Sequence, residues 1–205
     1  MNQFNYKDIF NNSHVAISRA ISLIENSDTI VDQFYEDIYQ KSNISIRIGI
    51  TGPPGAGKST LVDQLISRFI ENQKSVGVIA VDPSSPFTGG ALLGDRVRMG
   101  KYSDNENVYI RSMGNRGDLG GLSKMAQEAG DVLSASGKDI IIYETVGVGQ
   151  AEHDIVNAAD YTIDFTGVSA GGVVTGVVLT STDGSGYVAG DTIGITTANM
   201  DKGAG

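Results

Sequence analysis

One stretch of this chain combines residue types and spacing that suit phosphate binding. Residues 52–59 read GPPGAGKS, a full match to the pattern G-x-x-x-x-G-K-[ST]. Its three glycines let successive backbone N–H groups point at one anion, and a helix that begins near Lys58 adds its positive end. Lys58 can reach the β- and γ-phosphates of a nucleotide, and the Ser59 hydroxyl can hold Mg²⁺. The predicted contact residues are Gly52, Pro53, Pro54, Gly55, Ala56, Gly57, Lys58, Ser59 and Thr60.

The segments on either side of this loop have the periods that a phosphate-binding loop requires. Isoleucines alternate with Ser45, Arg47 and Gly49 before the loop, which predicts a β-strand over residues 44–51. After the loop, apolar residues recur with helical spacing at Leu61, Val62, Leu65, Ile66, Phe69 and Ile70. The order strand, glycine-rich turn and helix favours a nucleotide site over a glycine-rich turn that matches by chance.

Two further predicted strands end in a carboxylate. The apolar run 76–81 is followed by Asp82, and the run 139–143 is followed by Glu144. In open α/β sheets the carboxyl ends of the strands face the ligand crevice, and an acid at such an end binds Mg²⁺ directly or through water. Asp82 precedes a proline, so a turn-forming Asp-Pro pair is the alternative. Gln150 could orient a water, but a surface glutamine at a helix start explains it equally well.

Other elements are predicted from the same patterns. Residues 1–43 are expected to be helical, with one apolar stripe at Val15, Ile17, Ala20, Ile21 and Ile24, and a second at Ile30, Val31, Phe34, Tyr35 and Ile38. Residues 25–28 are expected to separate the two helices. Strands are predicted at 108–111 and 161–163, helices at 120–136 and 150–159, and a glycine-rich loop at 87–94.

Composition excludes several functions. The chain has 205 residues and a net charge of −9, which argues against nucleic-acid binding because no basic stripe is present. It contains no cysteine and only two histidines, so a zinc site is not expected. No apolar run approaches the length of a membrane span, and the first residues lack the build of a signal peptide. A cytoplasmic protein without membrane contact is therefore expected.

The ordered segments RIGITGPPGAGKSTLVDQL, AVDPSSPFTGGALLGDRVRM, IRSMGNRG, ETVGVGQAE and ADYT resemble the MeaB/ArgK/MMAA family over residues 10–163. The resemblance implies a P-loop GTPase that binds GTP or GDP with Mg²⁺ and acts as a metallochaperone for the cobalamin-dependent methylmalonyl-CoA mutase. It also implies a homodimer.

The resemblance assigns roles to particular residues. Lys58, Asp95 and Gln150 would be catalytic, and Ser59, Asp82, Asp95 and Glu144 would hold the metal. Residues 95–99 and 146–150 would be switch segments that sense the nucleotide. Asp95 could instead be an exposed loop acid, and a solvated or structural role is expected for Arg96, Arg98, Arg111 and Arg116.

The pattern of the family stops near Asp164. Asp164 would place a charge inside a predicted central strand, which would be costly if unpaired. The N-K-x-D motif and the C-terminal dimerisation arm of the family are absent from the chain. Residues 167–205 are rich in Gly, Thr and Val and predict either a β-hairpin, with strands at 173–180 and 187–197, or a flexible tail.

These observations predict an α/β P-loop NTPase fold of three layers with a mainly parallel sheet. Three parts are expected: a helical extension at 1–43, an incomplete nucleotide-binding domain at 44–163, and an unrelated β-prone tail at 164–205. The incomplete domain would leave a sheet edge uncovered. The predicted function is that of a GTP-hydrolysing metallochaperone. The alternatives are a P-loop kinase of small molecules and a non-catalytic chimera that retains only phosphate binding.

Overall fold

The strand that precedes the glycine-rich loop is an inner strand of a six-stranded sheet. The computed structural model describes residues 5–26, 32–42, 45–82, 100–114, 121–145, 158–168 and 174–181. The strand order is β3-β2-β4-β1-β5-β6. The first five strands of this order run parallel, and β6 is antiparallel to β5. The strands are β1 (Ile46–Thr51), β2 (Val76–Asp82), β3 (Val108–Gly114), β4 (Ile140–Thr145), β5 (Tyr161–Val168) and β6 (Val174–Ser181).

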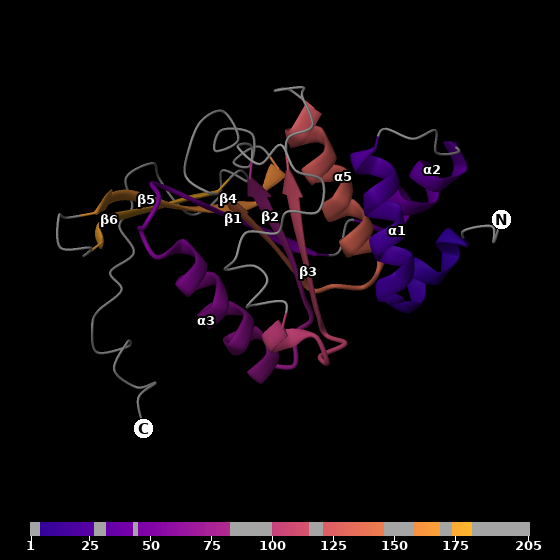
Figure 1. Ribbon diagram of the computed structural model, residues 1–205, viewed down its shortest axis with the longest axis horizontal. Helices are drawn as coiled ribbons and strands as arrows, with labels where there is room; N and C mark the ends of the chain where they lie inside the picture. The colour runs from indigo at the N-terminus through magenta and orange to yellow at the C-terminus, as the bar shows by residue number, and fades with distance from the viewer. Residues whose placement is uncertain are drawn as a thin grey trace.

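Helices cover the two faces of the sheet and make three layers (Figure 1). The helix that follows the phosphate loop, α3, packs on one face, and α5 packs on the other. Outside α5 lie the N-terminal helices, which contact α5 rather than the sheet in most of their packing. The helices are η1 (Tyr6–Asn11), α1 (His14–Glu25), α2 (Asp32–Lys41), α3 (Lys58–Glu71) and α5 (Gly121–Ala135). The predicted α/β fold with a mainly parallel sheet is confirmed.

Successive side chains of a strand point to opposite faces of the sheet, so the buried side chains form one cluster on each face. In β4, Ile140 and Ile142 pack with α3, whereas Ile141 and Tyr143 pack with α5 and α1. Both faces of β4 are therefore covered, which explains why its sequence is a continuous apolar run rather than an alternating one. The same division places Glu144 on the side of the sheet where α3 begins.

Two residues of the predicted N-terminal stripes are not in the core. Val15 is 64% exposed, and the core side of α1 is formed by Ala16, Ile17, Ala20, Ile21 and Ile24 instead. Tyr35 is 39% exposed because α2 is buried along Phe34 and Ile38, four residues apart, and the next residue points away from that line. The contribution of Ile30 and Val31 lies outside the described residues.

α1 ends inside the predicted break at residues 25–28, of which residues 27 and 28 lie outside the described residues. Glu25 is the last residue of α1 and is buried, and Asn26 is the C-terminal cap. The Glu25 carboxylate forms a close ion pair with Arg111 of β3, and the Ser22 hydroxyl lies 3.2 Å from the same guanidinium. Arg111 therefore has the structural role that the sequence predicted, and it joins α1 to the sheet.

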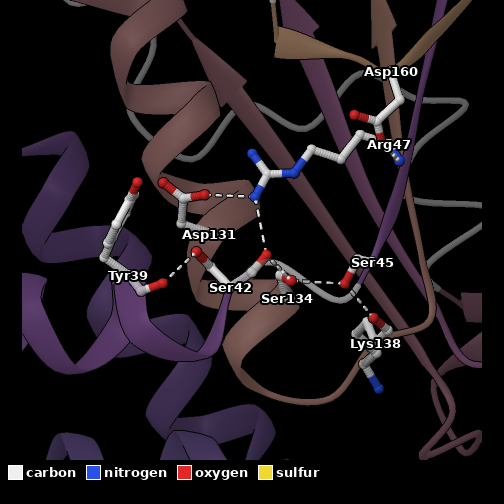
Figure 2. Close-up of polar contacts among 8 residues, drawn as sticks. All are labelled: Tyr39, Ser42, Ser45, Arg47, Asp131, Ser134, Lys138 and Asp160. Carbon is white, nitrogen blue, oxygen red and sulfur yellow. Dashed lines mark hydrogen bonds and ion pairs between the residues drawn. The ribbon is translucent and has the colours of Figure 1, made fainter. Parts of the chain in front are cut away.

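A second polar network fixes the start of β1 (Figure 2). The Arg47 guanidinium donates to Asp131 of α5 at 2.5 Å, and the Arg47 backbone N–H donates to Asp160 at 2.8 Å. The Ser134 hydroxyl of α5 donates to the carbonyl of Ser42, which follows α2. β1 is thus tied to α5, to the end of α2 and to the start of β5 at the edge opposite the phosphate loop.

The C-terminal part of the described chain joins the same sheet. β6 pairs along β5 from Tyr161↔Ser181 to Val168↔Val174 and covers that edge of β5, so the expected uncovered edge at β5 is not observed. The strand predicted at 173–180 is confirmed, but its described partner is β5; residues 187–197, the expected partner, lie outside the described residues.

Among the described residues, no helix is long and apolar enough to cross a membrane.

Candidate functional site

The glycine-rich loop connects β1 to α3 with the backbone geometry that its sequence requires. Gly52, Gly55 and Gly57 have φ angles of 123°, 78° and 87°, in the left-handed region that residues with a side chain rarely adopt. Gly57 is the N-cap of α3 and supplies no side-chain hydrogen bond to it. The first N–H groups of α3 therefore have no side-chain cap from this position, which leaves them available to an anion.

The Lys58 side chain is folded into the loop. It is 5% exposed, and its Nζ donates to the carbonyls of Gly52 at 2.6 Å and Pro53 at 2.9 Å. A buried ammonium needs such partners because burial without them would be costly. The charge of Lys58 is thereby held at the centre of the loop, next to the backbone that would surround a phosphate.

Ser59 and Glu144 meet across 85 residues of sequence. The Ser59 hydroxyl donates to the Glu144 carboxylate at 2.5 Å, and Glu144 is 5% exposed. Both residues lie at the carboxyl edge of the sheet, since Glu144 is next to the end of β4 and β4 pairs with β1 through Ile50↔Glu144. A hydroxyl oxygen and a carboxylate oxygen side by side are the kind of ligands that Mg²⁺ prefers.

The other predicted site residues are described only in part. Asp82 ends β2, the strand next to β4, so its backbone lies at the same edge of the sheet as Glu144. The Asp82 side chain, Asp95, Gln150 and the two predicted switch segments lie outside the described residues. The roles of all these residues remain predictions, and among the described residues the structure brings together Lys58, Ser59 and Glu144.

Sequence reasoning missed the contact between the loop and β5. The sequence indicated that a charge at Asp164 would be costly if unpaired, and the structure gives its carboxylate a partner, because the Thr51 hydroxyl donates to it at 3.0 Å. Phe165 lies directly against Gly52. The neighbouring Thr145 hydroxyl is buried and has no hydrogen-bond partner among the described residues. An alternation of polar and apolar residues at 162–165 was the available signal, but it did not identify the partner strand.

Comparison with known proteins gives a consistent result. Residues 17–179 match the family model described as methylmalonyl-CoA mutase-associated GTPase MeaB, so the match extends past residue 163. A protein of Pyrococcus horikoshii named as a GTPase is 54% identical over 145 residues, which are 71% of this chain and 46% of the relative. GTPase ArgK of Escherichia coli is 39% identical over 148 residues, which are 70% of this chain and 45% of the relative.

Relatives of lower sequence identity also match most of the chain. The mitochondrial methylmalonic aciduria type A homolog of Caenorhabditis elegans is 35% identical over 170 residues, which are 76% of this chain and 43% of the relative. Among solved structures, the LAO/AO transport system kinase has a TM-score of 0.60 at 28% identity and covers 81% of this chain and 51% of that chain. The chain thus spans about half the length of the relatives it matches.

Proposed function

Because this chain belongs to the MeaB family of methylmalonyl-CoA mutase-associated GTPases, we propose that it binds and hydrolyses GTP at residues 52–60. The observation that carries the proposal is the position of Lys58, whose Nζ is bound by two carbonyls of the loop itself. Exchange of these carbonyls for phosphate oxygens would keep the ammonium partnered while it neutralises charge on the nucleotide.

The residues present fit a magnesium ion. Ser59 and the buried Glu144 would hold it, and Asp82 and Asp95 are proposed as additional ligands. When bound, the ion neutralises charge that develops on the phosphates. The residues of the chain itself position the substrate: the loop N–H groups hold the phosphates, Lys58 bridges them, and Gln150 is proposed to orient the attacking water.

Lysine substitution tests the proposal. Lys58→Ala is expected to weaken GTP and GDP binding by about tenfold or more, because the charged hydrogen bonds to phosphate are lost. Isothermal titration measures the affinity, and phosphate release measures hydrolysis. Lys7→Ala is the matched control, since it removes the same charge from an exposed position of η1. Equal nucleotide binding by Lys58→Ala and the unchanged chain would instead support a non-catalytic chimera in which the loop is a remnant.

A kinase is the second candidate function, and the similarity to the LAO/AO transport system kinase favours it. A kinase would transfer the γ-phosphoryl group to an acceptor rather than to water. Phosphate release should therefore be compared for GTP and ATP, with and without candidate acceptors. Release of phosphate from GTP alone supports the GTPase, whereas phosphate that is found only on an acceptor supports the kinase.

The family description also supports a partner. We propose that the protein assists a cobalamin-dependent methylmalonyl-CoA mutase as a metallochaperone, in the cytoplasm and as a homodimer, with GTP hydrolysis controlling the interaction. Adding the purified mutase to the hydrolysis assay tests this role. A change in the rate of GTP hydrolysis on addition of the mutase is expected, and an unchanged rate together with no co-elution of the two proteins would contradict it.

A further inference from the structure

The phosphate loop begins beside two residues of β5. Thr51, the last residue of β1, is the register partner of Asp164 in the parallel β1–β5 pair. Side chains of partner residues in parallel strands lie on the same face, and here the Thr51 hydroxyl donates to Asp164 Oδ1 at 3.0 Å. The hydrogen bond therefore fixes the residue that immediately precedes Gly52.

Phe165 restricts the loop from the same strand. A Cβ atom placed on Gly52 would lie 2.6 Å from the Phe165 Cβ and 2.7 Å from the Phe165 carbonyl oxygen. Phe165 is buried in the core beneath α3, so β5 cannot withdraw easily to make space. By contrast, a Cβ on Gly55 or Gly57 would meet no heavy atom within 4 Å. The close contact is specific to the first residue of the loop.

Gly52 links these contacts to the lysine. Its carbonyl accepts the Lys58 ammonium at 2.6 Å, the shorter of the two hydrogen bonds of Lys58 to the loop. That carbonyl belongs to the Gly52–Pro53 peptide, so its orientation follows from the backbone angles of Gly52. Gly52 is restricted on one side by Thr51, which is hydrogen-bonded to Asp164, and on the other side by Phe165. A direct sequence of contacts thus runs from β5 to the phosphate-binding ammonium.

We propose that Asp164 is a positioning residue for nucleotide phosphate, acting through the Thr51 hydroxyl on the Gly52 carbonyl and Lys58. The inference rests on the proposed nucleotide binding and adds a residue outside the phosphate-loop motif. Asp164 does not touch the phosphate in this scheme. It keeps the loop in the conformation that receives the phosphate, so its loss lowers affinity while the chemistry at saturating nucleotide is retained.

Paired substitutions at Asp164 and Thr51 test the proposal. Asp164→Leu and Thr51→Val each remove the hydrogen bond and keep the number and branching of the side-chain heavy atoms. Each is expected to weaken GDP binding about fivefold, the effect of one net hydrogen bond. Asp164→Asn and Thr51→Ser keep an acceptor and a donor and are expected to bind within about twofold of the unchanged chain. The double substitution Asp164→Leu with Thr51→Val is expected to lose no more than either single change.

A purely structural role would give different results. In that case thermal stability would fall in the leucine and valine variants while the GDP affinity of the folded protein and the KM for GTP stayed the same. The proposal predicts a higher KM with kcat unchanged. It is overturned if Asp164→Leu binds GDP as well as the unchanged chain, or if Asp164→Asn is as weak as Asp164→Leu.

Amide hydrogen exchange of Gly52, Gly55, Ala56 and Gly57 in nucleotide-free protein separates this inference from the proposed function. Faster exchange is expected in Asp164→Leu and Thr51→Val than in the conservative variants, whether or not GTP is the substrate. If the unchanged chain binds no nucleotide, the proposed function fails while this measurement still decides the role of Asp164 in ordering the loop. Equal exchange in all five proteins overturns the inference.

Discussion

At the scale of single residues, the phosphate loop is held by contacts that a nucleotide would exchange or keep. Lys58 is bound to the Gly52 and Pro53 carbonyls, and Ser59 is bound to Glu144. Phosphate oxygens would take over the lysine contacts, whereas Gly52 also lies against Phe165 of β5, which is not part of the loop. The contacts of Lys58 can therefore be tested separately from those of Gly52, the first residue of the loop.

Alanine at Gly52 is expected to be more disruptive than alanine at Gly55. Both positions have a positive φ, which costs an alanine on the order of 1 kcal/mol. Only the Cβ at residue 52 also overlaps Phe165, and the buried neighbour must shift. Urea denaturation should show a loss of about 1 kcal/mol in the free energy of unfolding for Gly55→Ala and at least about 2 kcal/mol for Gly52→Ala. Equal losses would show that β5 moves freely away from the loop.

At the scale of secondary-structure elements, helices and strands could be predicted where a buried face determines the apolar pattern of the sequence. They were less predictable where contacts between residues distant in sequence determine the structure. The isoleucine run of β4 and the stripe Ile17, Ala20, Ile21 and Ile24 of α1 identified their elements, because each packs into a core on the face that the period indicates. Val15 and Tyr35 were misplaced because one more apolar residue beside a stripe does not reveal where the stripe ends.

Polar contacts between distant elements could not be predicted from local patterns. Glu25 was assigned to the predicted break, and no local pattern indicated its partner Arg111, which lies 86 residues away. The partner of Asp164 could not be named from the sequence because the order of strands, and thus the neighbour Thr51, is not encoded in any single segment. The same limit applies to Ser59 and Glu144, whose proximity followed only from the phosphate-loop motif and its resemblance to a family.

The Glu25–Arg111 pair is expected to anchor α1 to the sheet. Glu25 is 8% exposed and the Arg111 side chain 26%, so removing the arginine leaves a largely buried carboxylate without its counter-ion. Arg111→Met should lower the free energy of unfolding by about 2 kcal/mol, less than for a fully buried pair because solvent reaches the guanidinium. Chemical denaturation measures the loss.

The exposed pair Arg68–Glu71 provides the matched control. Both of its side chains are more than 60% exposed, so Arg68→Met should change the free energy of unfolding by less than about 0.5 kcal/mol. The double variant Glu25→Leu with Arg111→Met should be more stable than Arg111→Met alone, because no buried charge is left. If the arginine variants at positions 68 and 111 lose equal stability, the ion pair does not anchor α1.

At the scale of the whole molecule, one carbonyl joins three distant segments. The Glu106 carbonyl, before β3, accepts from Asn12 Nδ2 at 3.0 Å and from Lys138 Nζ at 2.9 Å, and His14 Nε2 lies 3.2 Å from it. Asn12 is the C-terminal cap of η1, His14 is the first residue of α1, and Lys138 lies between α5 and β4. Burial lowers the pKa of His14, and the nearby Lys138 charge lowers it further. The N-terminal helices are therefore joined to the segments before β3 and β4 through contacts to this one carbonyl.

Lys138 should make the stability of the fold depend on pH between about 8 and 10.5. Burial lowers the pKa of Lys138 from 10.5 to about 8, although the charges of Asp139 and Glu106 act in the opposite direction. Between these two pKa values the unfolded chain binds more protons than the folded chain, so the free energy of unfolding rises as pH increases. Urea denaturation at pH 7, 8, 9 and 10 should show that the free energy of unfolding rises by on the order of 1 kcal/mol in the unchanged chain.

Lys138→Met should remove that rise, whereas Lys7→Met, at an exposed position, should retain it. A Lys138→Met variant with the same pH dependence as the unchanged chain would show that the ammonium at this junction is as well stabilised in the fold as in water.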